Sequence, residues 1–251
     1  MNMKDQVVLV TGGAGGIAHA TCHRLAKEGA KVAIADLNIE AANKLADEIR
    51  AQGVEAIAIK VDVTSLDDTD RMAQTVLDKF GRIDILINMA GGAIPGIMGP
   101  FAQSTKEGWD RTIGLNLYGT LTCTRSVVNH MIARKKGKIV NMASVSGMVG
   151  QATTADYAAC KGGIIAFTKS LAKELAPYAI NVNCVSPSFT GTPRVLSMSK
   201  EFLQRQIDMI HLHRYAKPEE VANVIVFLAS DEADFVTGSN YVVDGGITLS
   251  Y

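Results

Sequence analysis

A tyrosine, a lysine and a serine stand at a spacing that suits proton transfer. Tyr157 and Lys161 are four residues apart in the run DYAACK, and Ser144 precedes the tyrosine by thirteen residues. If the run is helical, the phenol and the ammonium share one face. A lysine charge about 4 Å from the phenol, at an effective dielectric near 20, favours the phenolate by roughly 4 kcal/mol, on the order of three pKa units. The spacing therefore predicts a tyrosine with a lowered pKa that exchanges protons with an alcohol.

A glycine-rich turn, TGGAGGIA, follows the first strand-like run of the chain. Gly12, Gly15 and Gly16 allow a tight turn whose backbone N–H groups can approach a pyrophosphate at the start of the next helix. About 20 residues later, Asp36 ends the second strand-like run; such a carboxylate can bind both hydroxyls of a ribose and repels a 2′-phosphate. Leu37 follows, and the turn contains no Arg or Lys. The sequence therefore predicts NAD as the cofactor, rather than NADP.

Short apolar runs alternate with amphipathic segments, the pattern of a parallel sheet covered by helices on both faces. Seven strands are predicted, at Val7–Val10, Lys31–Ala35, Glu55–Lys60, Ile83–Ile87, Lys138–Met142, Ile180–Val185 and Asn240–Val243. Helices are predicted at Ile17–Glu28, Glu40–Ala51, Leu66–Phe80, Trp109–Ala133, Tyr157–Ala176 and Pro218–Ala229. No Pro-, Gly- or Ser-rich linker divides the chain. We therefore expect residues 1–251 to form a single doubly wound, Rossmann-like α/β domain.

The composition argues against several classes of partner. Lys plus Arg and Asp plus Glu both number 25 in the 251 residues, so neither nucleic acid nor an anionic membrane surface is expected to bind. No run approaches the ~18 apolar residues of a membrane span, and no apolar leader precedes the first strand-like run. The four cysteines lack the paired spacing of a metal or redox site. We expect a cytoplasmic protein.

Several motifs in order resemble the short-chain dehydrogenase/reductase family over essentially the whole chain. The glycine turn matches the pattern TGxxxGxG, with Ala18 in the place of the last glycine, and YAACK matches YxxxK. NMAG resembles the NNAG motif, DV after the third strand resembles the pair that holds the adenine ring, and PS resembles the PG motif after the sixth strand. Asn116, in LNLYG, occupies the position of the family's catalytic asparagine.

The resemblance implies a role for each matching residue. Tyr157 would exchange a proton with the substrate oxygen while hydride moves to or from nicotinamide, and Ser144 would donate a hydrogen bond to that oxygen. Lys161 would lower the pKa of the tyrosine and hold the nicotinamide ribose, and Asn116 would hold a water that connects Lys161 to solvent. The cofactor would bind to Gly12, Gly15, Gly16, Ile17, Asp36, Leu37, Asp62, Val63, Asn88, Ala90, Gly91, Tyr157, Lys161, Pro187, Thr190 and Thr192.

The expected activity is NAD-dependent hydride transfer to or from a largely apolar secondary alcohol or ketone. A substrate lid is expected around residues 189–212, where Leu and Met side chains would make an adaptable apolar wall. Two alternatives stay open: an enzyme acting on 3-oxoacyl or 3-hydroxyacyl thioesters, and a catalytically silent, cofactor-binding member of the family. The resemblance also implies a homotetramer, with interfaces formed by Trp109–Ala133, Tyr157–Ala176 and the apolar stretch Ile247–Tyr251.

Two further features have chemical potential outside these motifs. His19 and His23 lie four residues apart on the first predicted helix, but no third ligand is evident in the sequence, so no metal site is expected. Arg194 follows Thr192 and Pro193 at the mouth of the expected pocket, where it could pair with a carboxylate or phosphate of a substrate. A solvent-facing arginine is the favoured interpretation.

Overall fold

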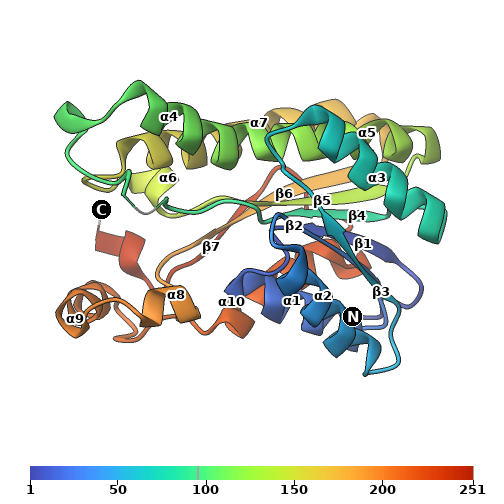
Figure 1. Ribbon diagram of the computed structural model, residues 1–251, viewed down its shortest axis with the longest axis horizontal. Coiled ribbons are helices and arrows are strands. Elements are labelled where there is room, and N and C mark those ends of the chain that lie inside the picture. The colour runs from blue at the N-terminus through green and yellow to red at the C-terminus, as the bar shows by residue number, and fades with distance from the viewer. Residues whose placement is uncertain (95, 251) are drawn as a thin grey trace.

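A seven-stranded parallel sheet forms the centre of the computed structural model, which describes residues 1–94 and 96–250 (Figure 1). Its strand order is β3-β2-β1-β4-β5-β6-β7. From β1 the chain continues through β2 to β3 at one edge of the sheet. It then returns to β4, beside β1, and continues through β5 and β6 to β7 at the other edge. The strands are β1 (Val7–Thr11), β2 (Lys31–Asp36), β3 (Ala56–Lys60), β4 (Ile85–Asn88), β5 (Gly137–Met142), β6 (Ile180–Pro187) and β7 (Asn240–Val243).

Helices cover both faces of this sheet, as the sequence predicted (Figure 1). One face carries α1 (Gly16–Lys27), α2 (Ile39–Arg50) and α10 (Pro218–Ala229). The other carries α3 (Leu66–Phe80), α4 (Lys106–Ile113), α5 (Gly119–Arg134) and α7 (Ala155–Leu175). The doubly wound, Rossmann-like α/β fold is therefore confirmed. Within the described ranges, no helix combines the length and the apolar character that a membrane crossing requires.

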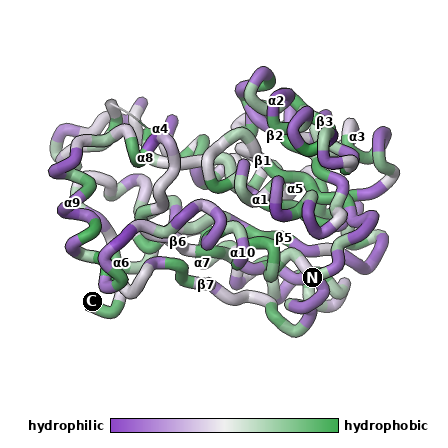
Figure 2. Tube along the Cα trace, turned by 90° about the horizontal axis from the view of Figure 1, so that it is seen from below, coloured by the Kyte–Doolittle hydropathy of each residue, from purple (hydrophilic) through white to green (hydrophobic). Residues whose placement is uncertain are grey.

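The central strands send alternate side chains into two separate hydrophobic layers. In β1, Val8 and Val10 belong to the layer beneath α1, α2 and α10, whereas Val7 and Leu9 belong to the layer beneath α3, α5 and α7. This is the pattern of a strand buried on both faces. Figure 2 shows the resulting hydrophobic colour around β1 and β5 in the middle of the molecule.

The predicted helix Trp109–Ala133 is present, but it begins three residues earlier and contains a π-helical turn that the sequence did not predict. The structure contains α4, a five-residue π-helical segment at Gly114–Tyr118, and then α5. Asn116 stands in the middle of the π segment, with both of its side-chain amide hydrogens donated to backbone carbonyls. π-helical segments inside α-helices occur frequently at functional sites.

Residues 189–212, which we call the 189–212 segment, contain two helices that the sequence did not resolve. These are α8 (Pro193–Leu196) and α9 (Lys200–Met209). The hydroxyl of Thr192 accepts a hydrogen bond from the N–H of Val195, and that of Ser199 accepts one from the N–H of Phe202, so each helix begins at a capping side chain. The segment lies beside the carboxyl ends of the strands (Figure 1).

Candidate active site

The predicted cofactor residues gather at the carboxyl edge of the sheet, around the ends of β1 and β4. Thr11 ends β1 beside Asn88 of β4, and its hydroxyl accepts hydrogen bonds from the N–H groups of Met89 (3.3 Å) and Ala90 (3.4 Å). At Gly12, φ is +63°, and an added Cβ would lie 2.6 Å from the Cα of Ala90. Only glycine fits there, because both the backbone conformation and the space exclude a side chain.

Asp36 is held by the backbone on both sides. One carboxylate oxygen accepts from the N–H of Ala14 in the glycine turn (3.0 Å), and the other accepts from the N–H of Asn38 (2.9 Å). The carboxylate is therefore fixed beside the turn where a pyrophosphate would lie. Leu37, the next residue, is 64% exposed.

The start of α1 lies directly against the 189–212 segment. A Cβ at Gly16 would lie 2.8 Å from the Cβ of Thr192 and 3.2 Å from Cδ of Pro193. Gly15, just before the helix, is exposed, and Ile17 is half-buried. Thr192 therefore stands against the helix terminus that offers its N–H groups to a phosphate.

The remaining cofactor candidates divide into edge positions and core positions. Asp62 is exposed, and its carboxylate accepts from the N–H (2.9 Å) and the hydroxyl (2.7 Å) of Thr64, while Val63 is buried against Gly119. Asn88 points into the core, where its amide donates to the hydroxyl of Thr124 (3.0 Å) and to Oδ1 of Asn141 (2.9 Å). Pro187 and Thr190 are buried at the end of β6.

Asn116 fastens the loop after β4. Its side chain accepts a hydrogen bond from the N–H of Gly92 (2.7 Å) and donates to the carbonyls of Gly92 (3.1 Å) and Thr112 (3.1 Å). At Gly91, φ is +144°, and an added Cβ would lie 2.7 Å from Oδ1 of Asn116 and 3.5 Å from Nζ of Lys161. Both amide hydrogens of Asn116 are used in these bonds, so its side chain has no donor left for the expected water.

Lys161 is a buried lysine on α7. It is 2% exposed, and its ammonium donates to the carbonyl of Met142 at the end of β5 (2.8 Å). Burial lowers the pKa of Lys161 to about 8. The side chain still carries a positive charge at neutral pH, but holding that charge away from water costs free energy.

Tyr157 lies next to Lys161, yet its pKa moves in the opposite direction from the one predicted. Nζ of Lys161 is 5.6 Å from the centroid of the Tyr157 ring. Burial raises the pKa of Tyr157 above 10, and a hydrogen bond with Ser144 and the charge of Arg194 offset only part of that effect. The expectation of a lowered pKa was wrong because the loss of water around the buried phenol outweighs the neighbouring charge. The phenol therefore stays protonated near neutral pH.

A glycine that the sequence analysis missed sets the position of Ser144. Ser144 precedes the short helix α6 (Ser146–Val149), and its hydroxyl accepts a hydrogen bond from the N–H of Ser146 (3.2 Å). At Gly147 an added Cβ would lie 2.5 Å from the backbone of both Lys161 and Gly162. The absence of a side chain thus lets α6 lie directly on α7 and brings Ser144 to Tyr157. No motif marked Gly147, since the contact joins segments far apart in sequence.

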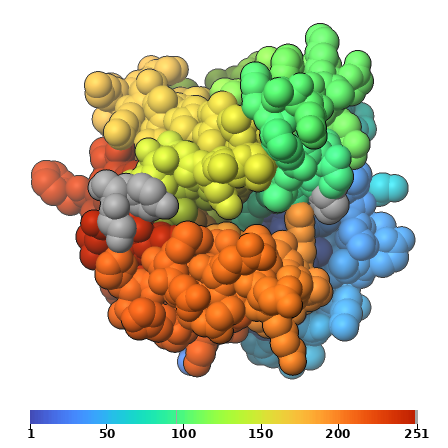
Figure 3. Space-filling model, turned by 90° about the vertical axis from the view of Figure 1, so that its left-hand side faces the viewer, coloured from blue at the N-terminus to red at the C-terminus, as the bar shows by residue number. Residues whose placement is uncertain are grey.

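Arg194 does not simply face solvent. It is exposed, but its guanidinium donates a hydrogen bond to the carbonyl of Ala93 in the loop after β4, and its charge acts on Tyr157. Figure 3 shows the side of the molecule where the 189–212 segment (orange) faces the segments near residues 100 (green) and 150 (yellow), with a hollow between them. A second hollow, around Asp84, Lys138 and Asp234, lies at the opposite edge of the sheet and contains none of the predicted site residues.

The geometry fits a nicotinamide dinucleotide. The glycine turn packs closely against Ala90 and Thr192 because Gly12 and Gly16 lack side chains, and Asp36 stands where an adenosine ribose would lie. The group formed by Ser144, Tyr157 and Lys161 is at the same sheet edge, so one extended cofactor could reach from Asp36 to the tyrosine. This chain's residues offer it a protonated phenol, a hydroxyl donor and a buried cation.

Comparisons with known proteins identify the family of this chain. A family model described as "Enoyl-(Acyl carrier protein) reductase" matches residues 12–248. A Synechocystis protein described as a 3-oxoacyl-(acyl-carrier-protein) reductase is 42% identical over 246 residues, 97% of each chain. A cyclopentanol dehydrogenase from Comamonas is 39% identical over 99% of each chain. The solved structure of an NAD⁺-bound xylitol dehydrogenase is 34% identical, with a TM-score of 0.93 over 98% of this chain and 100% of that one. The chain is therefore an oxidoreductase of the short-chain dehydrogenase/reductase family.

Proposed function

We propose that this protein is an NAD-dependent oxidoreductase that interconverts a secondary alcohol and its ketone. The observation that carries the proposal is the group formed by Ser144, Tyr157 and Lys161 at the sheet edge beside the glycine turn. Nicotinamide, when bound, supplies or accepts the hydride. The protein's task is to orient the substrate oxygen and to exchange one proton with it.

In the reduction direction, the protonation state of Tyr157 suits this task. The phenol is a proton donor near neutral pH because burial raises its pKa. It would give its proton to the ketone oxygen, while the hydroxyl of Ser144 donates a hydrogen bond to the same oxygen and stabilises the charge that develops there. Lys161, which is charged below pH about 8, lowers the cost of the phenolate that remains. In the oxidation direction the same proton returns to Tyr157.

The preference for NAD rests on Asp36 and Leu37. The carboxylate is fixed by two backbone N–H groups and so stays at the edge where it would meet a 2′-phosphate. The exposed Leu37 offers that phosphate no counter-charge. The NAD⁺-bound structure of the xylitol dehydrogenase relative agrees with this preference.

An apolar substrate is favoured by exposed hydrophobic side chains near the mouth of the site. Met98, Met148 and Leu196 are 48%, 44% and 52% exposed. Of these three residues, Leu196 belongs to the 189–212 segment. Two other apolar residues of that segment, Leu203 and Ile210, are instead buried. We propose that this segment is a substrate lid whose outer Leu and Met side chains contact the substrate. The cyclopentanol dehydrogenase relative acts on a substrate of this kind.

The second candidate substrate is a 3-oxoacyl thioester. The exposed Arg194 bridges α8 to the loop after β4, at the mouth of the site, and could pair with a phosphate on a long thioester substrate. The Synechocystis relative, described as a 3-oxoacyl-(acyl-carrier-protein) reductase, supports this candidate. A catalytically silent protein is disfavoured, because a binding protein gains nothing from a lysine buried beside a tyrosine.

One experiment separates these candidates. The purified protein is assayed by NADH absorbance with cyclic secondary alcohols and their ketones, and with 3-hydroxyacyl and 3-oxoacyl thioesters. We expect turnover with the first group and a large loss of turnover in Tyr157→Phe. Tyr178→Phe, at a partly exposed tyrosine remote from the site, serves as the control. Turnover restricted to thioesters, and reduced in Arg194→Gln, would establish the second candidate. Tyr157→Phe turning over within about tenfold of the parent would refute both enzymatic proposals.

We also propose that the protein is a cytoplasmic homotetramer without nucleic-acid or membrane partners. Two of the expected interface segments expose apolar surface. Tyr118, in the segment Trp109–Ala133, is 57% exposed, and Leu249, in the C-terminal stretch, is 79% exposed. Tyr251, the last residue of the expected C-terminal interface, lies outside the described residues. Light scattering at micromolar concentration should give four times the chain mass, and a monomer would contradict the assembly.

A further inference from the structure

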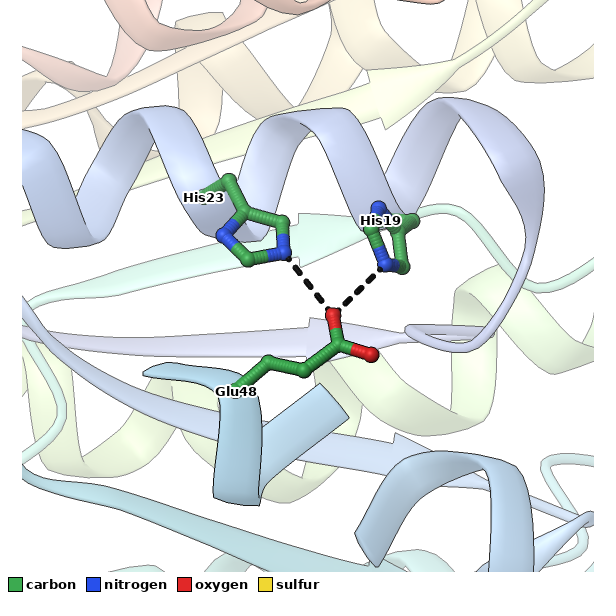
Figure 4. A group of neighbouring side chains, drawn as sticks. All are labelled: His19, His23 and Glu48. Carbon is green, nitrogen blue, oxygen red and sulfur yellow. Dashed lines mark hydrogen bonds and ion pairs between the residues drawn. The ribbon is translucent and has the colours of Figure 1, made fainter. Parts of the chain in front are cut away.

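A cluster of two histidines and a glutamate joins α1 to α2 on the outside of the molecule (Figure 4). His19 and His23 stand one turn apart on α1, and Glu48 reaches them from α2. A single carboxylate oxygen of Glu48 lies 3.0 Å from Nε2 of His19 and 3.1 Å from Nε2 of His23. The third donor that the sequence did not show is therefore present, and all three donor atoms lie within 4.8 Å of one another.

These distances suit a small divalent cation. In a tetrahedral zinc site with bonds of about 2.0–2.1 Å, neighbouring ligand atoms are roughly 3.3 Å apart. The two N–O distances are only a few tenths of an ångström shorter than this. Both imidazoles already present Nε2 to the same point, as Figure 4 shows, so side-chain adjustments around that point would place the three donors about one ion.

The cluster is also open to solvent and to ions. The side chains of His19, His23 and Glu48 are 48%, 30% and 35% exposed. Glu48 has no Lys or Arg partner among the ion pairs found in the described parts of the chain. Three protein donors leave a fourth position for water, as in open zinc sites.

Gln52, in the turn that follows α2, supports His23 from the other side. Its side-chain amide lies 3.0 Å from Nδ1 of His23 and donates to the carbonyl of Glu48 (3.1 Å). With a metal on Nε2, Nδ1 carries the proton and needs an acceptor, which the amide oxygen of Gln52 supplies if the amide turns over. Gln52 thus stands where an outer partner of a metal-bound histidine is found.

We propose that His19, His23 and Glu48 form a binding site for a divalent transition-metal ion, with Zn²⁺ as the principal occupant. Two imidazoles and one carboxylate favour Zn²⁺ over Mg²⁺, which prefers oxygen ligands. The bound ion would cross-link α1 to α2. Because α1 begins at the glycine turn and α2 follows Asp36, the ion would stabilise the half of the sheet that holds the adenosine part of a dinucleotide.

The test uses the full chain without a polyhistidine tag, stripped with EDTA and titrated with Zn²⁺ at pH 7.5 by calorimetry. The parent should bind one Zn²⁺ per chain and should not respond to Mg²⁺ at the same concentration. His23→Gln and Glu48→Gln should each weaken binding about tenfold or more, since even the loss of an outer partner costs 10–100-fold. His213→Asn removes a histidine that lies outside the cluster, on an exposed turn, and should bind as the parent does.

Thermal unfolding gives a second measurement that does not depend on catalysis. Saturating Zn²⁺ should raise the Tm of the parent and of His213→Asn, because the ion binds the folded chain, and should raise that of His23→Gln and Glu48→Gln by clearly less. Circular dichroism of each variant without metal verifies that it folds. An absence of Zn²⁺ binding at 100 µM would show that the cluster is only a hydrogen-bonded group and would overturn the proposal. Binding that persists undiminished in both variants would overturn it too, because the ion would lie elsewhere.

Discussion

The buried Lys161 should lower the stability of the fold at neutral pH, and the variant Lys161→Met measures that cost. The pKa of Lys161 falls from 10.5 to about 8 on burial, which at 1.36 kcal/mol for each pH unit corresponds to about 3 kcal/mol. Methionine fills a similar volume without a charge. It leaves the carbonyl of Met142 without its donor, a loss of about 1 kcal/mol. We therefore expect Lys161→Met to be more stable than the parent by roughly 2 kcal/mol at pH 7.

The pH dependence of this difference has a definite sign. Between pH about 8 and 10.5 the unfolded chain keeps a proton that the folded chain has released, so the stability of the parent rises with pH relative to the variant. Below pH 8 both states are protonated, and the cost of burial is present in full. Above pH 10.5 that cost is gone, and the variant should be less stable than the parent by about 1 kcal/mol, the value of the lost hydrogen bond.

The assay is urea unfolding at pH 7, 8, 9 and 10, followed by circular dichroism and by the fluorescence of Trp109, the single tryptophan. Coincident transitions are needed before free energies are compared. Lys169→Met, an exposed lysine on the same helix, is the control and should show no such trend. Lys161→Met should also lose turnover. A variant that is less stable at pH 7, or a difference that stays constant across this pH range, would refute the burial argument.

Two other predictions concern the cofactor and the packing around Ser144. Asp36→Ala combined with Leu37→Arg should shift kcat/KM from NAD toward NADP, because repulsion of the 2′-phosphate is lost and a counter-charge is gained; a parent that already prefers NADP would contradict the role of Asp36. Gly147→Ala should destabilise the protein by about 1–3 kcal/mol and reduce turnover, because its Cβ would press on the α7 backbone at 2.5 Å. Gly99→Ala, where a Cβ meets nothing within 4 Å, is the matched control for urea unfolding, and equal stability of the two variants would count against the packing argument.

Local patterns were sufficient to predict the sheet. All seven strands were identified because each contains a short, largely apolar run, and the predicted bounds of the last strand, Asn240–Val243, match the structure. The glycine turn after β1 and the aspartate that ends β2 were also identified, since both follow from the chemistry of dinucleotide binding. The sequence therefore predicted which residues meet at the carboxyl edge of the sheet.

Contacts between distant segments could not be predicted in the same way. Glu48 reaches His19 only because α1 and α2 pack with particular faces together, and a helical spacing within one segment carries no information about the other. The same is true of Gly147 against α7. The pKa of Tyr157 was predicted with the wrong sign because a four-residue spacing indicates a neighbouring charge but not the loss of water.

The π segment at Gly114–Tyr118 makes the position of Asn116 depend on the number of residues between α4 and α5. It acts as one extra residue inserted into an otherwise continuous helix. Deleting a residue there would let α4 and α5 join as one regular α-helix, because a π-helical turn accommodates one extra residue. The widened turn that places Asn116 would then close, and Asn116 would lose its hydrogen bonds to Gly92 and to the carbonyl of Thr112. A one-residue deletion that many surface loops tolerate would here disconnect the loop after β4 from the helix that carries Asn116.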